Sequence, residues 1–200
     1  MIGVGDTCMA GWAYTIFDTP IGRCGIAWSV AGIVGVQLPE VREIETRKRL
    51  FKHFPEARET RPPANVELAI EGIAALLRGE SANFADVTLD INGIPAFSQR
   101  VYRITREIPR GTTLTYNEIA VKLGASGAVR AVSQAIGRNP FVIIVPCHRV
   151  LEAGGYADKI SPYGGIISKR RLLSIEGTPC PSTKTLFDVL LPVAPPRLSG

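Results

Sequence analysis

The chain has 200 residues, of which 46% are hydrophobic, so it can bury a core in one large domain or two small ones. It has no apolar run of about 18 residues and no basic N-terminal region followed by an apolar stretch, which argues against a membrane span and a secretory signal. The cysteines, at 8, 24, 147 and 180, include no CxxC, which suits a reducing cytoplasm and argues against a zinc ribbon or a disulfide scaffold.

Charge is distributed unevenly along the chain, whose net charge is +5. Residues 1–94 contain 9 Lys/Arg and 12 Asp/Glu (net −3), whereas residues 95–181 contain 12 and 5 (net +7). A concentrated positive field favours a polyanionic partner, and nucleic acid is the first candidate. Charge alone fits an unspecific basic surface equally well.

The first half alternates short apolar runs with turn residues. Residues 12–18, 25–29 and 33–38 predict three strands of a small antiparallel sheet. Two helices are predicted to follow, a charged surface helix over 41–54 and an amphipathic helix over 63–77. Asn92-Gly93 is a turn signal. We therefore divide the chain into an α/β domain (1–92), a mainly helical domain (93–181) and a loose tail (182–200).

The second half begins with a helical pattern from residue 95 that ends at Pro109. Thr115 and Glu118 then predict a capping box, in which the hydroxyl accepts from the amide three residues on and the carboxylate reaches back. The helix that it starts is expected to run to about residue 123, and a second helix to cover 128–136. Two short helices around a Gly-containing turn predict a helix-turn-helix, which by itself is a weak sign of DNA binding.

The second of these helices has a small-residue face, with alanines at 128, 131 and 135, and one long cation, Arg130. A helix that reads the major groove normally presents several long polar side chains to base edges. A small face with one arginine fits close approach to a narrow groove, where Arg130 could enter the space left by an extruded base. Spacing alone slightly favours a simpler interpretation, in which the alanines pack on the preceding helix and Arg130 is solvated.

Cys147 lies beside His148, one of only two histidines, after the apolar run 141–144. The run predicts a strand or buried stretch that delivers a thiol beside an imidazole, and the thiolate is the reactive form of a cysteine. Such a pair also fits a cysteine hydrolase. Adjacent side chains on an extended segment point to opposite faces, however, which suits a water-bridged pair better than a direct acylating dyad.

Together these motifs resemble the O6-alkylguanine-DNA alkyltransferase family, also called methylated-DNA–protein-cysteine methyltransferases. The resemblance rests on the segments 97–101 (FSQRV), 108–113 (IPRGTT), 115–118 (TYNE), 129–132 (VRAV), 139–140 (NP), 146–150 (PCHRV) and 172–177 (LLSIEG). It implies an α+β chain, in which an RNase-H-like α/β domain precedes a mainly helical domain with a winged helix-turn-helix.

The resemblance also implies a DNA-repair reaction in which an alkyl group passes irreversibly, once per molecule, from guanine O6 to the cysteine, with O4-alkylthymine as an open second substrate. By matching motif, Cys147 would be the acceptor, His148 would take the thiol proton through a water, and Glu176 would orient the histidine. Asn139 would hold the active-site turn. Tyr116 would push on the target phosphate and donate to the edge of the flipped guanine.

The same resemblance implies the contacts with DNA. Arg130 would replace the flipped nucleotide in the stack. Further DNA contacts would come from Tyr116, Ala128, Ala131 and Gln134, and the base pocket from Ile136, Val142 and Tyr163. The expected partner is double-stranded DNA containing O6-alkylguanine, bound by a monomer in the cytoplasm at the nucleoid, or in the nucleus of a eukaryotic cell. We expect no cofactor and no metal, because Cys8, Cys24 and His53 do not match the zinc ligands of some relatives.

Two other functions are considered for Cys147, a lesion sensor and a cysteine hydrolase. A non-catalytic lesion sensor related to the family would lack the acceptor, so Cys147 argues against it. A cysteine hydrolase would leave the helix-turn-helix unexplained. Arg149 is expected to pin the site turn through carbonyl contacts, and residues 169–171 to form a solvated or phosphate-facing basic cluster.

Overall fold

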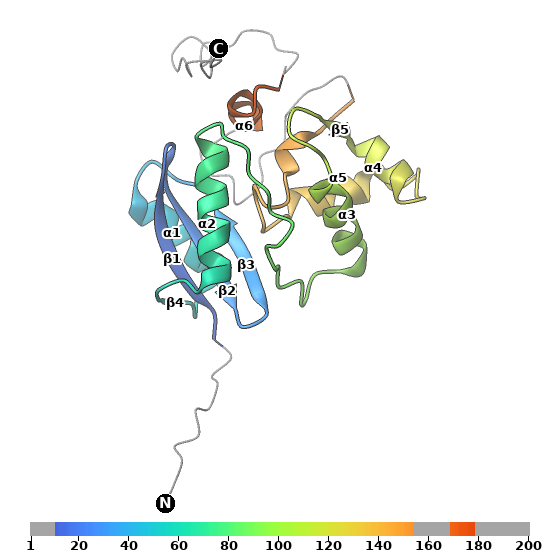
Figure 1. Ribbon diagram of the computed structural model, residues 1–200. Coiled ribbons are helices and arrows are strands. Elements are labelled where there is room, and N and C mark those ends of the chain that lie inside the picture. Colours follow the sequence, from blue (N-terminus) through green and yellow to red (C-terminus); the bar gives the residue numbers. More distant parts are fainter. Residues whose placement is uncertain (1–10, 154–168, 179–200) are drawn as a thin grey trace, which may run out of the picture.

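The computed structural model describes residues 11–153 and 169–178. Its first half is a four-stranded sheet in the order β3-β2-β1-β4 (Figure 1). The strands are β1 (Ala13–Thr19), β2 (Gly22–Ser29), β3 (Gly32–Gln37) and β4 (Arg58–Glu59). The first three form the predicted antiparallel meander, and β4 pairs parallel to β1. Gly22 begins β2 and Gly32 begins β3, with φ values of 124° and 141°, a backbone conformation that residues with a Cβ atom rarely adopt.

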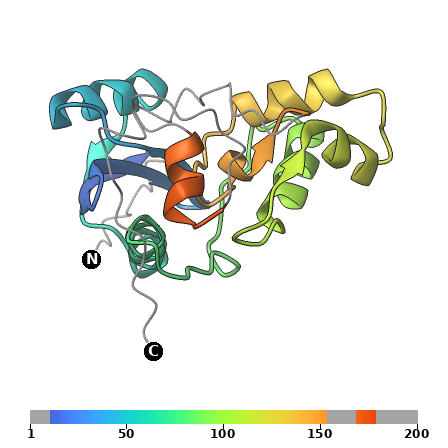
Figure 2. The same ribbon diagram turned by 90° about the horizontal axis from the view of Figure 1, so that it is seen from above.

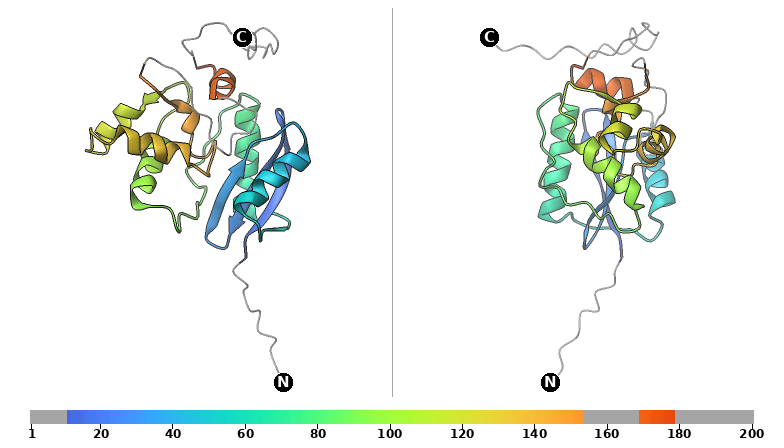
Figure 3. Two further views of the ribbon diagram at one scale, coloured as in Figure 1. Left: turned by 180° about the vertical axis from the view of Figure 1, so that it is seen from behind. Right: turned by 90° about the vertical axis from the view of Figure 1, so that its right-hand side faces the viewer.

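Two helices of the first half, α1 (Glu43–His53) and α2 (Ala64–Leu77), cover opposite faces of the sheet (Figures 2 and 3). Successive strand residues point to opposite faces, and β2 follows this rule. Ala27 packs with Leu50 and Phe54 on the α1 side, whereas Ile26 belongs to the larger core with Ile73 of α2. Both predicted helices are therefore confirmed, and the structure adds the face of the sheet that each one covers.

The second half is mainly helical. It contains α3 (Ala96–Arg106), α4 (Tyr116–Lys122), α5 (Val129–Gly137), α6 (Lys169–Ile175), the 3₁₀ turn η1 (Cys147–Arg149) and the parallel strands β5 (Leu114–Thr115) and β6 (Val150–Leu151). The capping box is confirmed, since Thr115 Oγ1 accepts from the Glu118 N–H (3.1 Å) and the Glu118 carboxylate accepts from the Thr115 N–H (2.6 Å). In the described ranges, no helix combines the length and the apolar character needed to cross a bilayer. The chain thus has a mixed α+β fold.

The β3 edge of the sheet meets the second half just before Cys147. The Val36 N–H donates to Pro140 O (2.8 Å), and Val36 and Phe141 form an isolated parallel bridge. Both side chains are fully buried in the core cluster that also contains Cys147. The first half therefore helps to hold the segment that presents the cysteine.

Candidate active site

Cys147 begins η1 directly after a tight buried turn. The fully buried Asn139 closes this turn, because its Nδ2 donates to Val145 O (2.9 Å) and its Oδ1 accepts from the Phe141 N–H (3.0 Å). The backbone adds two bonds of 2.7 Å, from Val145 N–H to Phe141 O and from Cys147 N–H to Val145 O. Ile143 has a φ of 74°, which is rare for a β-branched residue, so its surroundings must impose this conformation.

The sequence predicted either an apolar strand or a buried stretch before Cys147. The buried stretch is correct, and the strand is not. Residues 141–145 are buried, but they form a turn with isolated bridges. Asn139 takes up backbone groups that strand pairing would otherwise use. Cys147 and His148 consequently lie on a 3₁₀ turn and not on an extended segment. The alternation of strand side chains therefore cannot exclude a direct cysteine–histidine dyad.

The Cys147 side chain lies in a buried environment, with the residue 4% exposed. Burial raises the pKa of its thiol, because a thiolate would lose its hydration. The charge of Lys169 and hydrogen bonds from the Asn139 side chain and from the local backbone lower that pKa without cancelling the effect of burial. Cys147 is thus a thiol at neutral pH and needs a proton acceptor to become a nucleophile.

His148 is fully buried, and its Nε2 lies 2.9 Å from Glu176 Oε1. Burial would raise the pKa of Glu176, but hydrogen bonds and charges from His148 and Arg149 outweigh it and lower this pKa to about 2. Since an ionised carboxylate only accepts, Nε2 carries the imidazole proton. Nδ1 is buried without a hydrogen-bond partner among the described residues. Burial also lowers the pKa of His148, so the ring is neutral and Nδ1 is available to accept a proton.

Arg149 also donates to the carboxylate of Glu176, a contact that the sequence did not suggest. Its Nε and Nη2 donate to Glu176 Oε2 (3.0 Å) and Oε1 (2.7 Å). Its Nη1 donates to Ile108 O (2.6 Å), a carbonyl contact of the kind predicted for it. This bidentate pairing fixes the plane of the Glu176 carboxylate. Arg149 and His148 therefore place Glu176 jointly.

Lys169 does not belong to a solvated basic cluster, which corrects the prediction. It is 6% exposed, and its Nζ donates to Tyr116 Oη (3.2 Å) and Val150 O (3.0 Å). A lysine is almost always exposed unless it has such partners, which here allow its burial. Its position beside two arginines in the sequence wrongly suggested an exposed basic cluster. Because Tyr116 Oη accepts from a cation, its own O–H is available to donate.

Helix α5 presents one face to solvent and packs the other into the core. The residues of the exposed face include Arg130, Ala131 and Gln134, with Ala128 half-buried at the helix start. On the buried face, Ala135 O accepts from Tyr102 Oη (3.0 Å), and Ile136 is 2% exposed. Only part of the alanine face therefore packs on neighbouring helices.

Of the remaining residues singled out in the sequence, some are buried in the structure and others lie outside the described ranges. Val142 is 2% exposed and lies in the core cluster with Ile136 and Cys147. Cys24 is buried, and burial raises the pKa of its thiol to about 12 despite a hydrogen bond with Thr19. The predictions for Tyr163, Cys8, Cys180 and the tail 182–200 concern residues outside the described ranges.

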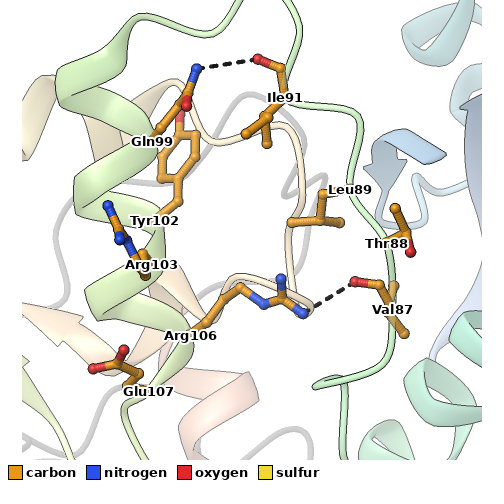
Figure 4. A pocket seen from close by; sticks show the side chains of 9 residues that line it. All are labelled: Val87, Thr88, Leu89, Ile91, Gln99, Tyr102, Arg103, Arg106 and Glu107. Atoms are coloured by element: carbon orange, nitrogen blue, oxygen red, sulfur yellow. Dashed lines mark hydrogen bonds between the residues drawn. The ribbon is translucent and has the colours of Figure 1, made fainter. Parts of the chain in front are cut away.

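Two cavities lie at the junction of the two halves. One, of about 430 Å³, lies between α3 and residues 87–91, and Arg106 reaches across it to donate to Val87 O at 3.2 Å (Figure 4). The other, of about 420 Å³, is lined by residues 82–85 and 106–110 and reaches the back of the reactive turn. Cys147 lines neither cavity.

Comparison with known proteins identifies relatives along most of the chain. Residues 96–178 match the family model for the DNA-binding domain of 6-O-methylguanine DNA methyltransferase. The chain is 39% identical over 176 residues to the methylated-DNA–protein-cysteine methyltransferase of Mycobacterium tuberculosis, which covers 88% of this chain and 98% of that protein. A protein of the same name from Methanothermobacter thermautotrophicus is 32% identical over 158 residues, covering 79% and 81%.

Solved structures give the same result. The crystal structure of the M. tuberculosis O6-methylguanine methyltransferase matches with a TM-score of 0.65 at 37% identity, over 88% of this chain and 99% of that one. The crystal structure of M. tuberculosis OGT in complex with DNA matches with a TM-score of 0.65 at 35% identity, over 82% and 92%. The chain therefore belongs to the methylated-DNA–protein-cysteine methyltransferase family and is a DNA-repair enzyme that transfers an alkyl group to a cysteine.

Proposed function

We propose that Cys147 accepts the alkyl group from O6 of a guanine flipped out of double-stranded DNA, irreversibly and once per molecule. One observation carries the proposal: a buried thiol, a neutral imidazole with an available Nδ1, and an ionised carboxylate 2.9 Å from Nε2 occur together at Cys147, His148 and Glu176. Such a set can take the thiol proton onto the histidine and stabilise the imidazolium that results.

In the proposed step the Cys147 proton passes to His148 Nδ1 through one water molecule. The thiolate sulfur attacks the alkyl carbon, the S–C bond forms, and the C–O6 bond breaks with its electron pair left on the guanine. A proton donated to the base edge makes guanine a better leaving group, and the Tyr116 hydroxyl, held by Lys169, is the proposed donor. The thioether product is stable, so each molecule reacts once.

The proposed DNA contacts lie on the exposed face of α5. Arg130 would fill the stack where the flipped nucleotide was. This role is supported by its side chain, which is exposed and makes no hydrogen bond or ion pair with a described residue. The small side chains of Ala128 and Ala131 beside it would allow close approach to a groove, and Gln134 is a further proposed DNA contact. Ile136, Val142 and Tyr163 are the proposed lining of the base pocket.

The finer architecture is part of the proposal. A sheet with a helix on each face supports an RNase-H-like first domain over 1–92. The pair α4–α5 supports a winged helix-turn-helix within a second domain over 93–181, followed by the tail. We propose that the protein acts as a monomer, because one chain supplies the whole set of reacting groups. Because the proposed substrate is chromosomal DNA, we propose that the protein works at the chromosome, in the cytoplasm or in a eukaryotic nucleus.

Titration with a duplex that carries one O6-methylguanine tests the proposal. With lesion in excess, the number of repaired guanines should reach a plateau at one per protein molecule. Tight binding without loss of the methyl group would favour a lesion sensor. Repair that continues past one guanine per molecule would favour a hydrolytic, recycling mechanism. Either result would contradict the proposed single transfer.

A further inference from the structure

Arg110 joins the ends of two helices that come from different halves of the chain. Just past α2, its guanidinium donates to the carbonyl oxygens of Gly79 (2.6 Å) and Glu80 (2.5 Å). At the end of α6, it donates to those of Ile175 (3.3 Å) and Glu176 (3.2 Å). Helices α2 and α6 lie in contact here (Figures 1 and 2). One side chain thus bridges the first half and the residue that pairs with His148.

The two helix ends share the same backbone geometry. Gly79 and Gly177 have φ values of 85° and 71°, and each helix closes with the same pair of backbone bonds around its glycine. Carbonyl groups in the last turn of a helix lack helical partners and carry the negative end of its dipole; those of Ile175 and Glu176 lie at this end of α6, whereas those of Gly79 and Glu80 directly follow the end of α2. Neither α2 nor α6 has a basic residue in its last turn. Arg110 supplies that cation to both helices from a separate segment.

We propose that Arg110 is a positioning residue for alkyl transfer. By holding the carbonyl oxygens of Ile175 and Glu176, it fixes the backbone from which the Glu176 side chain reaches His148. This inference rests on the proposed roles of His148 and Glu176. It also gives the first half of the chain a part in the reaction, because α2 anchors the same guanidinium.

The test compares Arg110→Ala with Arg78→Ala, which removes an exposed arginine from the same end of α2. We expect Arg110→Ala to lower the rate constant for methyl transfer from a saturating O6-methylguanine duplex about 10- to 100-fold, the range that a small misplacement of a reacting group causes. The Kd for the duplex should not change, because the exposed face of α5 is untouched. Arg78→Ala should alter neither quantity.

The imidazole NMR spectrum supplies a readout that a general loss of stability would not move. The chain has only two histidines, so a His53→Gln variant assigns the signals of His148. In folded Arg110→Ala, the Nε2–H resonance of His148 should shift as its bond to Glu176 changes. A wild-type resonance and rate would overturn the proposal. If Arg110→Ala does not fold, Arg110→Met, which keeps the apolar stem and removes the donors, is held to the same two outcomes.

A double variant separates this inference from the proposed function. In a Glu176→Gln background, Arg110→Ala should add no further loss of rate, since both changes act through one contact. An equal loss in both backgrounds would mean that Arg110 acts independently, and the proposal would fail. If Glu176→Gln alone reacts at the wild-type rate, the proposed role of Glu176 is wrong. If Glu176→Gln is slow and Arg110→Ala is normal, only the role of Arg110 is wrong.

Discussion

Replacing Asn139 with alanine tests whether this side chain holds the reactive turn. The substitution removes two hydrogen bonds. The buried N–H of Phe141 loses its acceptor, whereas the buried carbonyl of Val145 keeps the bond from the Cys147 N–H. One unsatisfied buried group costs about 1–3 kcal/mol, so we expect a loss of about 1–3 kcal/mol in the free energy of unfolding. A further hydrogen bond to the Cys147 thiolate also disappears, so the pKa of Cys147 should rise and methyl transfer should slow.

Urea unfolding at pH 7 measures the loss of stability, and methyl transfer is measured at a temperature where the variant is fully folded. Asn117→Ala is the matched control, because Asn117 is exposed on α4 and its loss should change stability by no more than about 0.5 kcal/mol. A loss below about 1 kcal/mol for Asn139→Ala would refute the reasoning, because one orphaned buried group alone should cost that much.

Three further predictions each concern one residue. Arg130→Ala should slow repair in duplex DNA more than reaction with free O6-benzylguanine, and an equal loss on both substrates would contradict its role in base flipping. Burial lowers the pKa of His148, so the transfer rate constant should stay constant as the pH falls through 6.5 and decline only below it; a midpoint at 6.5 or above would contradict this. Over the same range stability should fall, because the unfolded histidine binds a proton that the folded one does not. Gly35→Ala would bring a Cβ to 2.7 Å from the Phe54 ring, so calorimetry should show a destabilisation of about 1–3 kcal/mol, and an unchanged Tm would contradict the tight packing.

Features set by neighbouring residues could be predicted from the sequence. The capping box at Thr115 depends on residues three positions apart, and the charged periodic pattern of α1 and the apolar stripe of α2 depend on helical spacing. The glycine after Ile136 likewise lies at the end of its helix. In each case the signal and the structure lie within one or two turns of chain, so no distant contact could override them.

Features set by distant contacts could not be predicted in the same way. The turn before Cys147 depends on Asn139 and on a bond from Val36, about a hundred positions earlier, so its apolar run resembled a strand. Lys169 is buried because Tyr116 and a backbone carbonyl receive its ammonium group. The pairing of Arg149 with Glu176 joins residues 27 positions apart, and only the three-dimensional structure brings those groups together.

The identity of the acceptor is the central claim, and the mass of the intact protein tests it most directly. The wild-type protein and a Cys147→Ser variant are each incubated with a duplex that carries O6-methylguanine, and the site of any added mass is then mapped by peptide analysis. The account predicts that the wild-type protein gains one methyl group, on Cys147, and that the variant gains none. A methyl group on Cys24 or elsewhere, or loss of the methyl group from DNA in the presence of Cys147→Ser, would contradict it.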